Sequence, residues 1–257
     1  MNITILSNRD IASAYALSHL VTGLTGHKLQ VFLSARVGKH HSHTPKALQK
    51  LSAFDAALVE GRQGQGQRFQ ASGAFATLEA ELHQPITLLS SVKTKTGLSA
   101  LRRSQADLII SIRFGLILHQ EAIDLAKLGV INLHSGILPS YKGVMATFWA
   151  MKNRETNIGT TLHYIQNKQI DSGDVIAISK QAVDYRRSYL WNVLRLYPQG
   201  CRDIISAVKQ LSSNQALNAK AQKSSGHYYS FPDDNDIKAF ADQGNCLFEK
   251  NEILALL

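Results

Sequence analysis

Short apolar runs alternate with amphipathic segments along most of the chain. Runs rich in β-branched residues predict strands at residues 2–7, 28–35, 85–90, 107–114, 130–134, 158–166 and 173–183. Helical periodicity predicts helices at residues 10–23, 44–59, 75–84, 97–105, 119–129, 144–155 and 188–212. This alternation is typical of βαβ units. We therefore predict an α/β fold: a Rossmann-like, mostly parallel, twisted sheet with helices on both faces.

The segment "VINLHSGILPSYKG", residues 130–143, interrupts this pattern with polar residues. Asn132 and His134 stand two positions apart at the end of a strand, so they point to the same face. In open α/β sheets, the carboxyl ends of central strands line the ligand crevice. We therefore expect both side chains to face a binding site, with Pro139 and Gly143 shaping the turn beside it.

The C-terminal part shows a less regular pattern. A long helix is predicted at residues 188–212, with Pro198 kinking or splitting it. From residue 223 onward we expect an irregular tail with one short helix. The chain is accordingly divided into a Rossmann-like part, residues 1–184, and a helical or irregular extension, residues 185–257.

Composition limits the class of protein more than its function. The chain has 257 residues, of which 44% are hydrophobic, so it can bury a sizeable core. Its formal net charge of +9 is compatible with an anionic partner, but the basic residues are dispersed and a solvated basic surface explains the charge equally well. No signal peptide or membrane-spanning run is found, so we expect a cytoplasmic protein without a membrane partner.

Metal and disulfide chemistry are not predicted. Cys201 and Cys246 lie far apart and fit neither a disulfide framework nor a zinc site. The cluster His40, His41 and His43 lacks the spacing and the accompanying ligands of a metal site, so a surface loop is the better interpretation.

Three side chains offer a common chemistry. Asn132 provides an amide donor, His134 a group that exchanges protons near neutral pH, and Asp171, in "QIDSGD", a carboxylate. Together they suffice to polarise a carbonyl, stabilise an oxyanion and move the proton of an attacking amine. The carboxylate would orient the imidazole and favour its protonated form. Spacing alone does not bring Asp171 to His134, and a single histidine on a strand is more often structural.

The ordered set "NLHSGILPSYKG", "IGTTLHYI" and "QIDSGDVI" resembles the formyltransferases that use 10-formyltetrahydrofolate. The resemblance spans residues 130–176, is weaker upstream, and is specific because the elements keep family order. It implies that Asn132 binds the formyl oxygen, that His134 stabilises the tetrahedral intermediate and transfers protons, and that Asp171 orients His134 or a water.

The resemblance also implies binding segments. The donor would lie along "SIRFGLILH", clasped by Phe114, Gly115, Ile117 and Leu118, although ordinary strand-end packing explains these residues too. Tyr141, Lys142 and His163 are the expected acceptor-binding residues. For His163 the alternative is a core histidine with satisfied hydrogen bonds.

Departures from the family bear on the acceptor. Glycinamide ribonucleotide formyltransferases carry a Gly-rich phosphate loop after the first strand, whereas this chain has "SNRDIAS", in which Ser7, Asn8 and Asp10 look like helix-start residues. Methionyl-tRNA formyltransferases add a C-terminal barrel, and formyltetrahydrofolate hydrolases an N-terminal domain, neither of which is expected here. The run "PSYKGVMATFWAM", with Trp149, looks most like that of the sugar-nucleotide N-formyltransferases.

We therefore expect formyl transfer from 10-formyltetrahydrofolate to a small-molecule amine, foremost the aminosugar of a nucleotide-linked sugar. The alternatives are an amino-acid-type amine such as N-hydroxyornithine, methionyl-tRNA, or a folate- or nucleotide-binding regulator without activity. Nucleic-acid binding through the positive charge is a further, less favoured function. The sequence leaves open the acceptor, the pathway, the role of the tail and the oligomeric state, for which a homodimer is one option.

Overall fold

A seven-stranded sheet forms the centre of the protein. The computed structural model describes residues 1–34, 44–62, 73–223 and 226–257. The strands are β1 (Asn2–Asn8), β2 (Lys28–Ser34), β3 (Thr87–Leu88), β4 (Leu108–Ile112), β5 (Val130–His134), β7 (Asn157–Tyr164) and β8 (Val175–Ala182), and they lie in the order β3-β2-β1-β4-β5-β7-β8. The first five are parallel to their neighbours, and the last two pair antiparallel. The predicted mostly parallel α/β sheet is confirmed.

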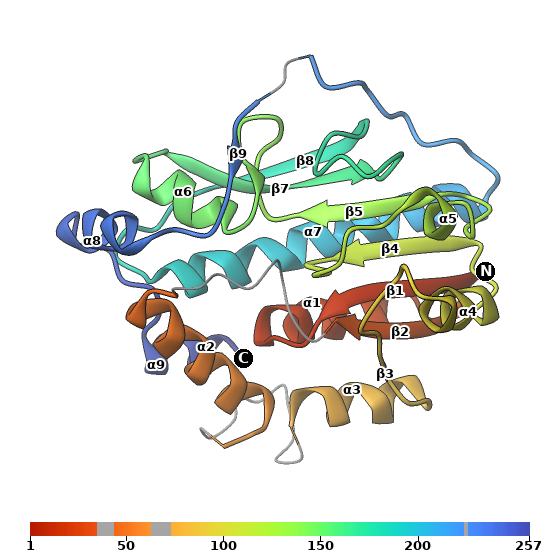
Figure 1. The fold of residues 1–257 in the computed structure, drawn as a ribbon, viewed down its shortest axis with the longest axis horizontal. Coiled ribbons are helices and arrows are strands. Elements are labelled where there is room, and N and C mark those ends of the chain that lie inside the picture. Colours follow the sequence, from red (N-terminus) through yellow and green to blue (C-terminus); the bar gives the residue numbers. More distant parts are fainter. Residues whose placement is uncertain (35–43, 63–72, 224–225) are drawn as a thin grey trace.

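Helices cover both faces of the sheet, as predicted (Figure 1). They are α1 (Ile11–Gly23), α2 (Lys46–Val59), α3 (Ala74–Leu82), α4 (Lys95–Arg103), α5 (Gln120–Ile123), α6 (Ala146–Lys152), α7 (Tyr189–Ser212), α8 (Asp234–Asp242) and α9 (Lys250–Leu256). The larger core contains residues of α1, α3 and α7, and the smaller core contains residues of α4 and α5. Within the described ranges, no helix has the length and apolarity needed to cross a membrane.

The alternation of side chains along β5 fixes which face carries the polar pair. Ile131 and Leu133 are buried in the larger core with α7, whereas Val130 belongs to the smaller core on the opposite face. Because successive side chains of a strand alternate, Asn132 and His134 share the face of Val130. Leu133 and its neighbours therefore anchor the strand, and the polar residues remain on the face opposite α7.

Several predicted elements differ in extent. Helix α5 is a single turn instead of residues 119–129, because Leu128 N–H donates to Asp107 O (2.7 Å) and draws the chain toward β5. Helix α2 begins at Lys46, with Pro45 at the N-cap and no side-chain cap, two residues later than predicted. Helix α7 continues through Pro198 without splitting, since the buried face of the helix outweighs one missing backbone hydrogen bond.

The tail is more ordered than predicted. It forms two helices instead of one: α8 begins at a capping box between Asp233 and Asp236, and the Glu249 side chain caps α9. Upstream of α8, strand β9 (Tyr228–Tyr229) pairs in parallel with β6 (Lys142–Gly143). In Figure 1 this part of the tail, in blue, runs from β9 down to α8.

The boundary predicted after residue 184 stays a prediction. Helix α7 follows that boundary in sequence and crosses behind β4 and β5 in Figure 1. Its residues Leu194 and Tyr197 are fully buried in the same core as α1. The helix therefore packs against the Rossmann-like sheet as one of its layers.

Helix α7 packs tightly against the sheet at Gly200. A Cβ at this position would lie 2.8 Å from Leu133 Cδ2 and 3.1 Å from Thr160 Oγ1. We expect Gly200→Leu to lower the free energy of unfolding by about 1–3 kcal/mol, because the helix must move away from β5. Denaturant titration measures this change. Gln210→Leu, on the exposed face of the same helix, is the control and should stay within about 0.5 kcal/mol of wild type; an equal effect of both would contradict the prediction.

Candidate active site

Asn132 is oriented by a histidine on the neighbouring strand. Across the β5–β7 pair, Asn132 stands opposite His163, and Asn132 Nδ2 lies 3.0 Å from His163 Nε2. The other ring nitrogen, Nδ1, lies 2.8 Å from Tyr164 O and donates to that carbonyl. In the neutral ring Nε2 is therefore an acceptor for the amide. An amide nitrogen carries two N–H groups, so the second N–H of Asn132 can serve a substrate.

Asp171 is the residue that connects the site. It lies in the loop between β7 and β8 with φ 50°, a left-handed conformation that aspartate tolerates better than most residues. Its Oδ2 lies 3.5 Å from His134 Nδ1, and its Oδ1 lies 3.5 Å from His163 Nε2. Gly143 N–H donates to Oδ2 (2.8 Å), and the Gln222 side chain donates to the Asp171 carbonyl (2.9 Å). The structure thus places Asn132, His134 and Asp171 in one cluster. Their spacing in the sequence could not predict this proximity.

The charge of Asp171 is stabilised in spite of its burial. Only 9% of the residue is exposed, and burial by itself would raise the pKa of the carboxyl. The charge of His134, the hydrogen bond and charge that His163 supplies in its protonated form, and the hydrogen bond from Gly143 outweigh burial and lower the pKa to about 2. The carboxyl is therefore ionised at neutral pH and offers a fixed negative charge to two imidazoles.

Both ring nitrogens of His134 face acceptors. Nε2 lies 2.6 Å from Tyr141 O, and Nδ1 faces the Asp171 carboxylate. A doubly protonated ring satisfies both acceptors. Gly136 makes this arrangement possible, because a Cβ there would lie 2.6 Å from His134 Nε2. His134 is 8% exposed, so the ring is held within the protein with its edge against the 135–143 turn.

An aromatic wall, which we define as Tyr141, Trp149 and Tyr229, stands beside the turn. The Tyr229 ring stacks on Tyr141 (5.5 Å between centroids) and on Trp149 (4.9 Å). Tyr141 itself is 7% exposed, and its hydroxyl donates to Glu155 Oε1 (2.7 Å). Lys142, on β6, pairs with Tyr228 of β9. The tail therefore contributes to the site through the Tyr229 ring. In the sequence, the aromatic run "HYYSF" was the only feature that indicated this contact.

Of the residues expected to bind the acceptor, His163 is the most buried. It is 1% exposed and contacts Asn132 and Asp171. In this position it supports the other two polar side chains. The cluster His40, His41 and His43 lies outside the residues that the structure describes.

The four residues expected to clasp the donor follow β4 directly. Ile117 is 49% exposed, whereas Leu118 is 4% exposed and packs in the smaller core, against which Phe114 also packs. Gly115 N–H donates to Ser34 Oγ at the end of β2 (2.9 Å). The segment is thus fixed by its backbone and by two of its apolar side chains, while Ile117 is open to solvent. Its role in donor binding stays a prediction.

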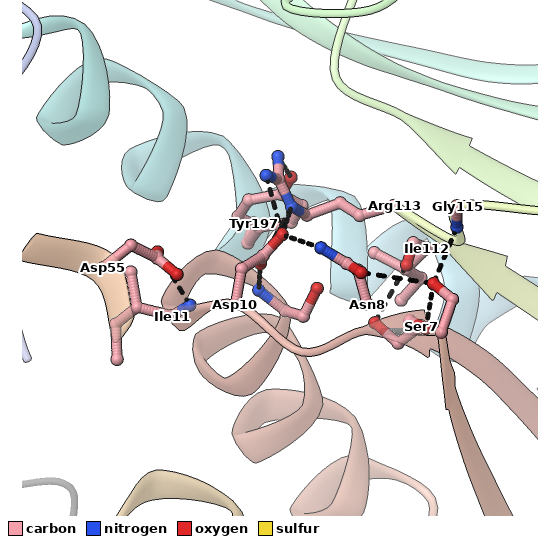
Figure 2. Close-up of polar contacts among 11 residues, drawn as sticks. Ser7, Asn8, Asp10, Ile11, Asp55, Ile112, Arg113, Gly115 and Tyr197 are labelled. Atoms are coloured by element: carbon pink, nitrogen blue, oxygen red, sulfur yellow. Dashed lines mark hydrogen bonds and ion pairs between the residues drawn. The ribbon is translucent and has the colours of Figure 1, made fainter. Parts of the chain in front are cut away.

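The start of α1 is occupied by a carboxylate of the chain itself. Asp10 Oδ1 accepts the N–H of Ser13 (2.7 Å), which confirms the predicted helix-start role of Asp10, whereas Ser7 and Asn8 belong to β1. Figure 2 shows the Arg113 guanidinium directed at Asp10 from the end of β4, with an Nη2–Oδ2 distance of 2.9 Å. Burial would raise the pKa of Asp10, but Arg113 and hydrogen bonds lower it. Sequence reasoning missed this partner, although an arginine directly after the apolar run "LIISI" was a signal.

The fold and the polar cluster at the end of β5 define an α/β enzyme-like site at the place where such sheets bind small ligands. Residues 40–189 match the formyl transferase family. The chain therefore belongs to this family, which confirms the predicted family and the enzyme class, formyltransferase.

Curated relatives include methionyl-tRNA formyltransferases. That of Fusobacterium nucleatum is 32% identical over 143 residues, which are 56% of this chain and 44% of that protein. That of Akkermansia muciniphila is 36% identical over 104 residues, which are 40% of this chain and 33% of that protein. The chain thus spans less than half the length of these two relatives.

Solved structures with a similar fold have other acceptors in their names. A sugar N-formyltransferase of a Shewanella species has a TM-score of 0.57 and 15% identity, covering 93% of this chain and 86% of that chain. Glycinamide ribonucleotide transformylase 1 of Symbiobacterium toebii has a TM-score of 0.59 and 12% identity, covering 86% and 93%. An N-formyltransferase of Helicobacter canadensis, solved with folinic acid and dTDP-3-aminofucose, has a TM-score of 0.55 and 18% identity, covering 98% and 85%. At these identities the likeness establishes the fold.

The low pKa of Asp171 predicts a pH dependence of stability. A carboxyl whose pKa is lower in the folded protein stabilises the fold above its unfolded value, 3.8, and loses this contribution as pH falls toward the folded value of about 2. The shift corresponds to roughly 2 kcal/mol. We expect the unfolding free energies of wild type and Asp171→Asn to differ at neutral pH and to converge over this acidic range in denaturant titrations.

Asp174→Asn, in the same loop, is the matched control for this prediction. The Asp174 side chain accepts from Gln166 at a partly exposed position and does not touch the two histidines. Its unfolding curve should follow that of wild type through the acidic range. Parallel curves for wild type and Asp171→Asn would show that the Asp171 charge does not stabilise the folded state.

Proposed function

We propose that this chain transfers the formyl group of 10-formyltetrahydrofolate to a primary amine, and that the amine belongs to a nucleotide-linked aminosugar. The observation that carries the reaction is the cluster of Asn132, His134 and Asp171 at the end of β5, in a chain that belongs to the formyl transferase family. An amide donor, an imidazole and an ionised carboxylate, connected through His163, meet the chemical needs of amine formylation.

The reaction begins when the unprotonated amine attacks the formyl carbon, forming a C–N bond while the carbonyl electrons move to oxygen. The free N–H of Asn132 and the protonated ring of His134 stabilise the oxyanion. His134 gives its ring proton to the folate nitrogen, and the proton released by the amine, relayed by a water beside Asp171, replaces it on the ring. The bond from the formyl carbon to that nitrogen then breaks, and tetrahydrofolate leaves.

This mechanism requires one rearrangement. In the structure His134 Nε2 is bound to Tyr141 O at 2.6 Å, and Nδ1 faces Asp171. For the ring to donate to the formyl oxygen, the oxygen must replace the Tyr141 carbonyl as the acceptor of Nε2–H. Movement of the 135–143 turn would make this exchange, while Asp171 keeps the ring oriented.

The aminosugar acceptor is supported by the aromatic wall and by the start of α1. Stacked rings with exposed neighbours, such as Tyr228 at 59% exposure, offer surface on which a nucleobase can stack. The N-terminus of α1, where a Gly-rich loop would bind a phosphate, is occupied by the Asp10 carboxylate. This arrangement disfavours a ribonucleotide phosphate bound in that place.

Methionyl-tRNA is the second candidate acceptor. The curated relatives with matching sequence carry that name, and the formal charge of +9 is compatible with an RNA. An acceptor assay distinguishes the two. The protein is incubated with 10-formyltetrahydrofolate and, separately, dTDP-linked aminosugars, N-hydroxyornithine and methionyl-tRNA, and mass spectrometry identifies the formylated product. Formylation of methionyl-tRNA alone would overturn the aminosugar proposal, and the absence of any product would leave folate binding without activity as the better description.

His134→Asn tests the proposed mechanism. We expect its turnover to fall by about 10²–10⁴-fold, the usual contribution of a general acid–base group. The matched control is His83→Asn, an exposed histidine at the C-cap of α3, whose left-handed backbone asparagine tolerates. Rates are measured with the acceptor identified above. Near-normal turnover of a folded His134→Asn protein would exclude His134 from the reaction.

A further inference from the structure

A buried ion pair joins two segments that lie far apart in sequence. The guanidinium of Arg113 approaches Asp10 with three contacts: Nε to Oδ1 (3.1 Å), Nε to Oδ2 (3.0 Å) and Nη2 to Oδ2 (2.9 Å). The side chain of Asp10 is 11% exposed and that of Arg113 25%. Charge-assisted contacts of this forked kind fix orientation as well as distance.

On one side, hydrogen bonds connect the ion pair to residues 113–118, the segment expected to bind the donor. Asn8 Nδ2 donates to Asp10 Oδ2 (2.9 Å), and Ser34 Oγ lies 3.2 Å from Asn8 Oδ1. Ser34 Oγ in turn accepts the N–H of Gly115 (2.9 Å). Arg113 is itself the first residue after β4 and has φ 56°. The segment that begins there is therefore tied to β1 and β2 twice, through its first residue and through Gly115 (Figure 2).

On its other side, the ion pair lies near the end of β5, the strand that carries the proposed catalytic residues. Arg113 Nη1 donates to the hydroxyl of Tyr197 (3.3 Å), which is fully buried on α7. The side chain of Ser135, the residue that follows His134, lies near the same hydroxyl and lowers its pKa, although burial raises it more. Arg113 thus lies between the segment after β4 and the residue next to the proposed catalytic histidine.

A second carboxyl, that of Asp55, lies at the same helix start and responds to the charge of Asp10. Asp55 Oδ1 accepts the N–H of Ile11 (3.0 Å), and burial together with the charge of Asp10 raises the pKa of Asp55 to about 7. The charge of Asp10 is thus strong enough to disfavour ionisation of its neighbour. Arg113 balances Asp10, and removing the guanidinium would leave a buried carboxylate without its counter-charge.

We propose that Arg113 is a positioning residue for the formyl donor: its fork to Asp10 and its contact with Tyr197 hold residues 113–118 at a fixed distance from the end of β5. This inference rests on the proposed function, because the donor must lie between that segment and His134. If the fork is lost, the segment relaxes and the donor binds less tightly, although no atom of Arg113 needs to touch it.

The test uses Arg113→Met, which keeps the length of the side chain and removes its charge. The probe is folinic acid, a stable formyl-folate, and isothermal titration calorimetry gives the dissociation constant and the number of binding-competent sites separately. We expect the dissociation constant to rise by roughly ten- to a hundredfold with near-wild-type stoichiometry, because binding would then have to order a segment that the fork no longer holds. A merely structural role would reduce the number of competent sites and leave the dissociation constant unchanged.

Two further variants keep the test informative if Arg113→Met folds poorly. Arg113→Lys retains the charge but cannot form the fork, and Asp10→Asn retains the helix cap while removing the charge. Both should weaken folinic acid binding, the lysine variant less than methionine. Arg186→Met is the matched control, because Arg186 makes the same forked contact with Asp184 on the surface, where its side chain is 89% exposed. It should bind folinic acid as wild type does.

The outcomes separate this inference from the proposed function. If wild type does not bind folinic acid, the proposed function fails and the inference fails with it. If wild type binds and the Arg113 and Asp10 variants bind equally tightly, the proposed function stands and the positioning role of Arg113 is overturned. Weaker binding by these variants, with unchanged binding by Arg186→Met, supports the inference.

Discussion

The buried charge of Asp171 is the constraint on which the rest of the site depends. Its carboxylate contacts His134 and His163, and it also accepts the backbone N–H of Gly143. A charge with 9% exposure is tolerated only if such partners surround it. The need to compensate one carboxylate therefore fixes the relative positions of β5, β7 and the turn after β5. The left-handed backbone at Asp171 is the local strain that this arrangement entails.

A second buried carboxylate, that of Asp10 after β1, likewise holds distant segments of the chain together. Asp10 is balanced by Arg113, which comes from a segment 103 positions away in sequence. Tyr197 and Ser135 connect this pair to the strand end that carries His134. The proposed donor segment is therefore held from the side of β1, whereas the proposed catalytic histidine is held from the side of β7. The rigid α7, which supplies Tyr197, stabilises both arrangements.

The sequence predicted the features that local residue patterns determine. It missed the contacts that depend on how distant segments of the chain meet. The alternation of strands and helices and the shared face of Asn132 and His134 follow from periodicity alone. Contacts between Asp171 and His134, and between Asp10 and Arg113, depend on how distant segments meet, and no spacing rule contains that information. Pro198 shows the converse case, since a local rule predicted a kink or a split, and the buried face of α7 keeps the helix from splitting.

The difference between the two sides of the site explains why the donor is easier to infer than the acceptor. The donor side is built on β1, β2 and β4, long parallel strands whose positions the core determines. The acceptor side is built on β6 and β9, which have two residues each and owe their pairing to stacked aromatic rings and to glycines such as Gly143. Small changes in the tail would reshape this wall without disturbing the sheet. Acceptor choice can therefore differ among chains with the same fold and catalytic cluster, in keeping with the different acceptors in the names of the matched proteins.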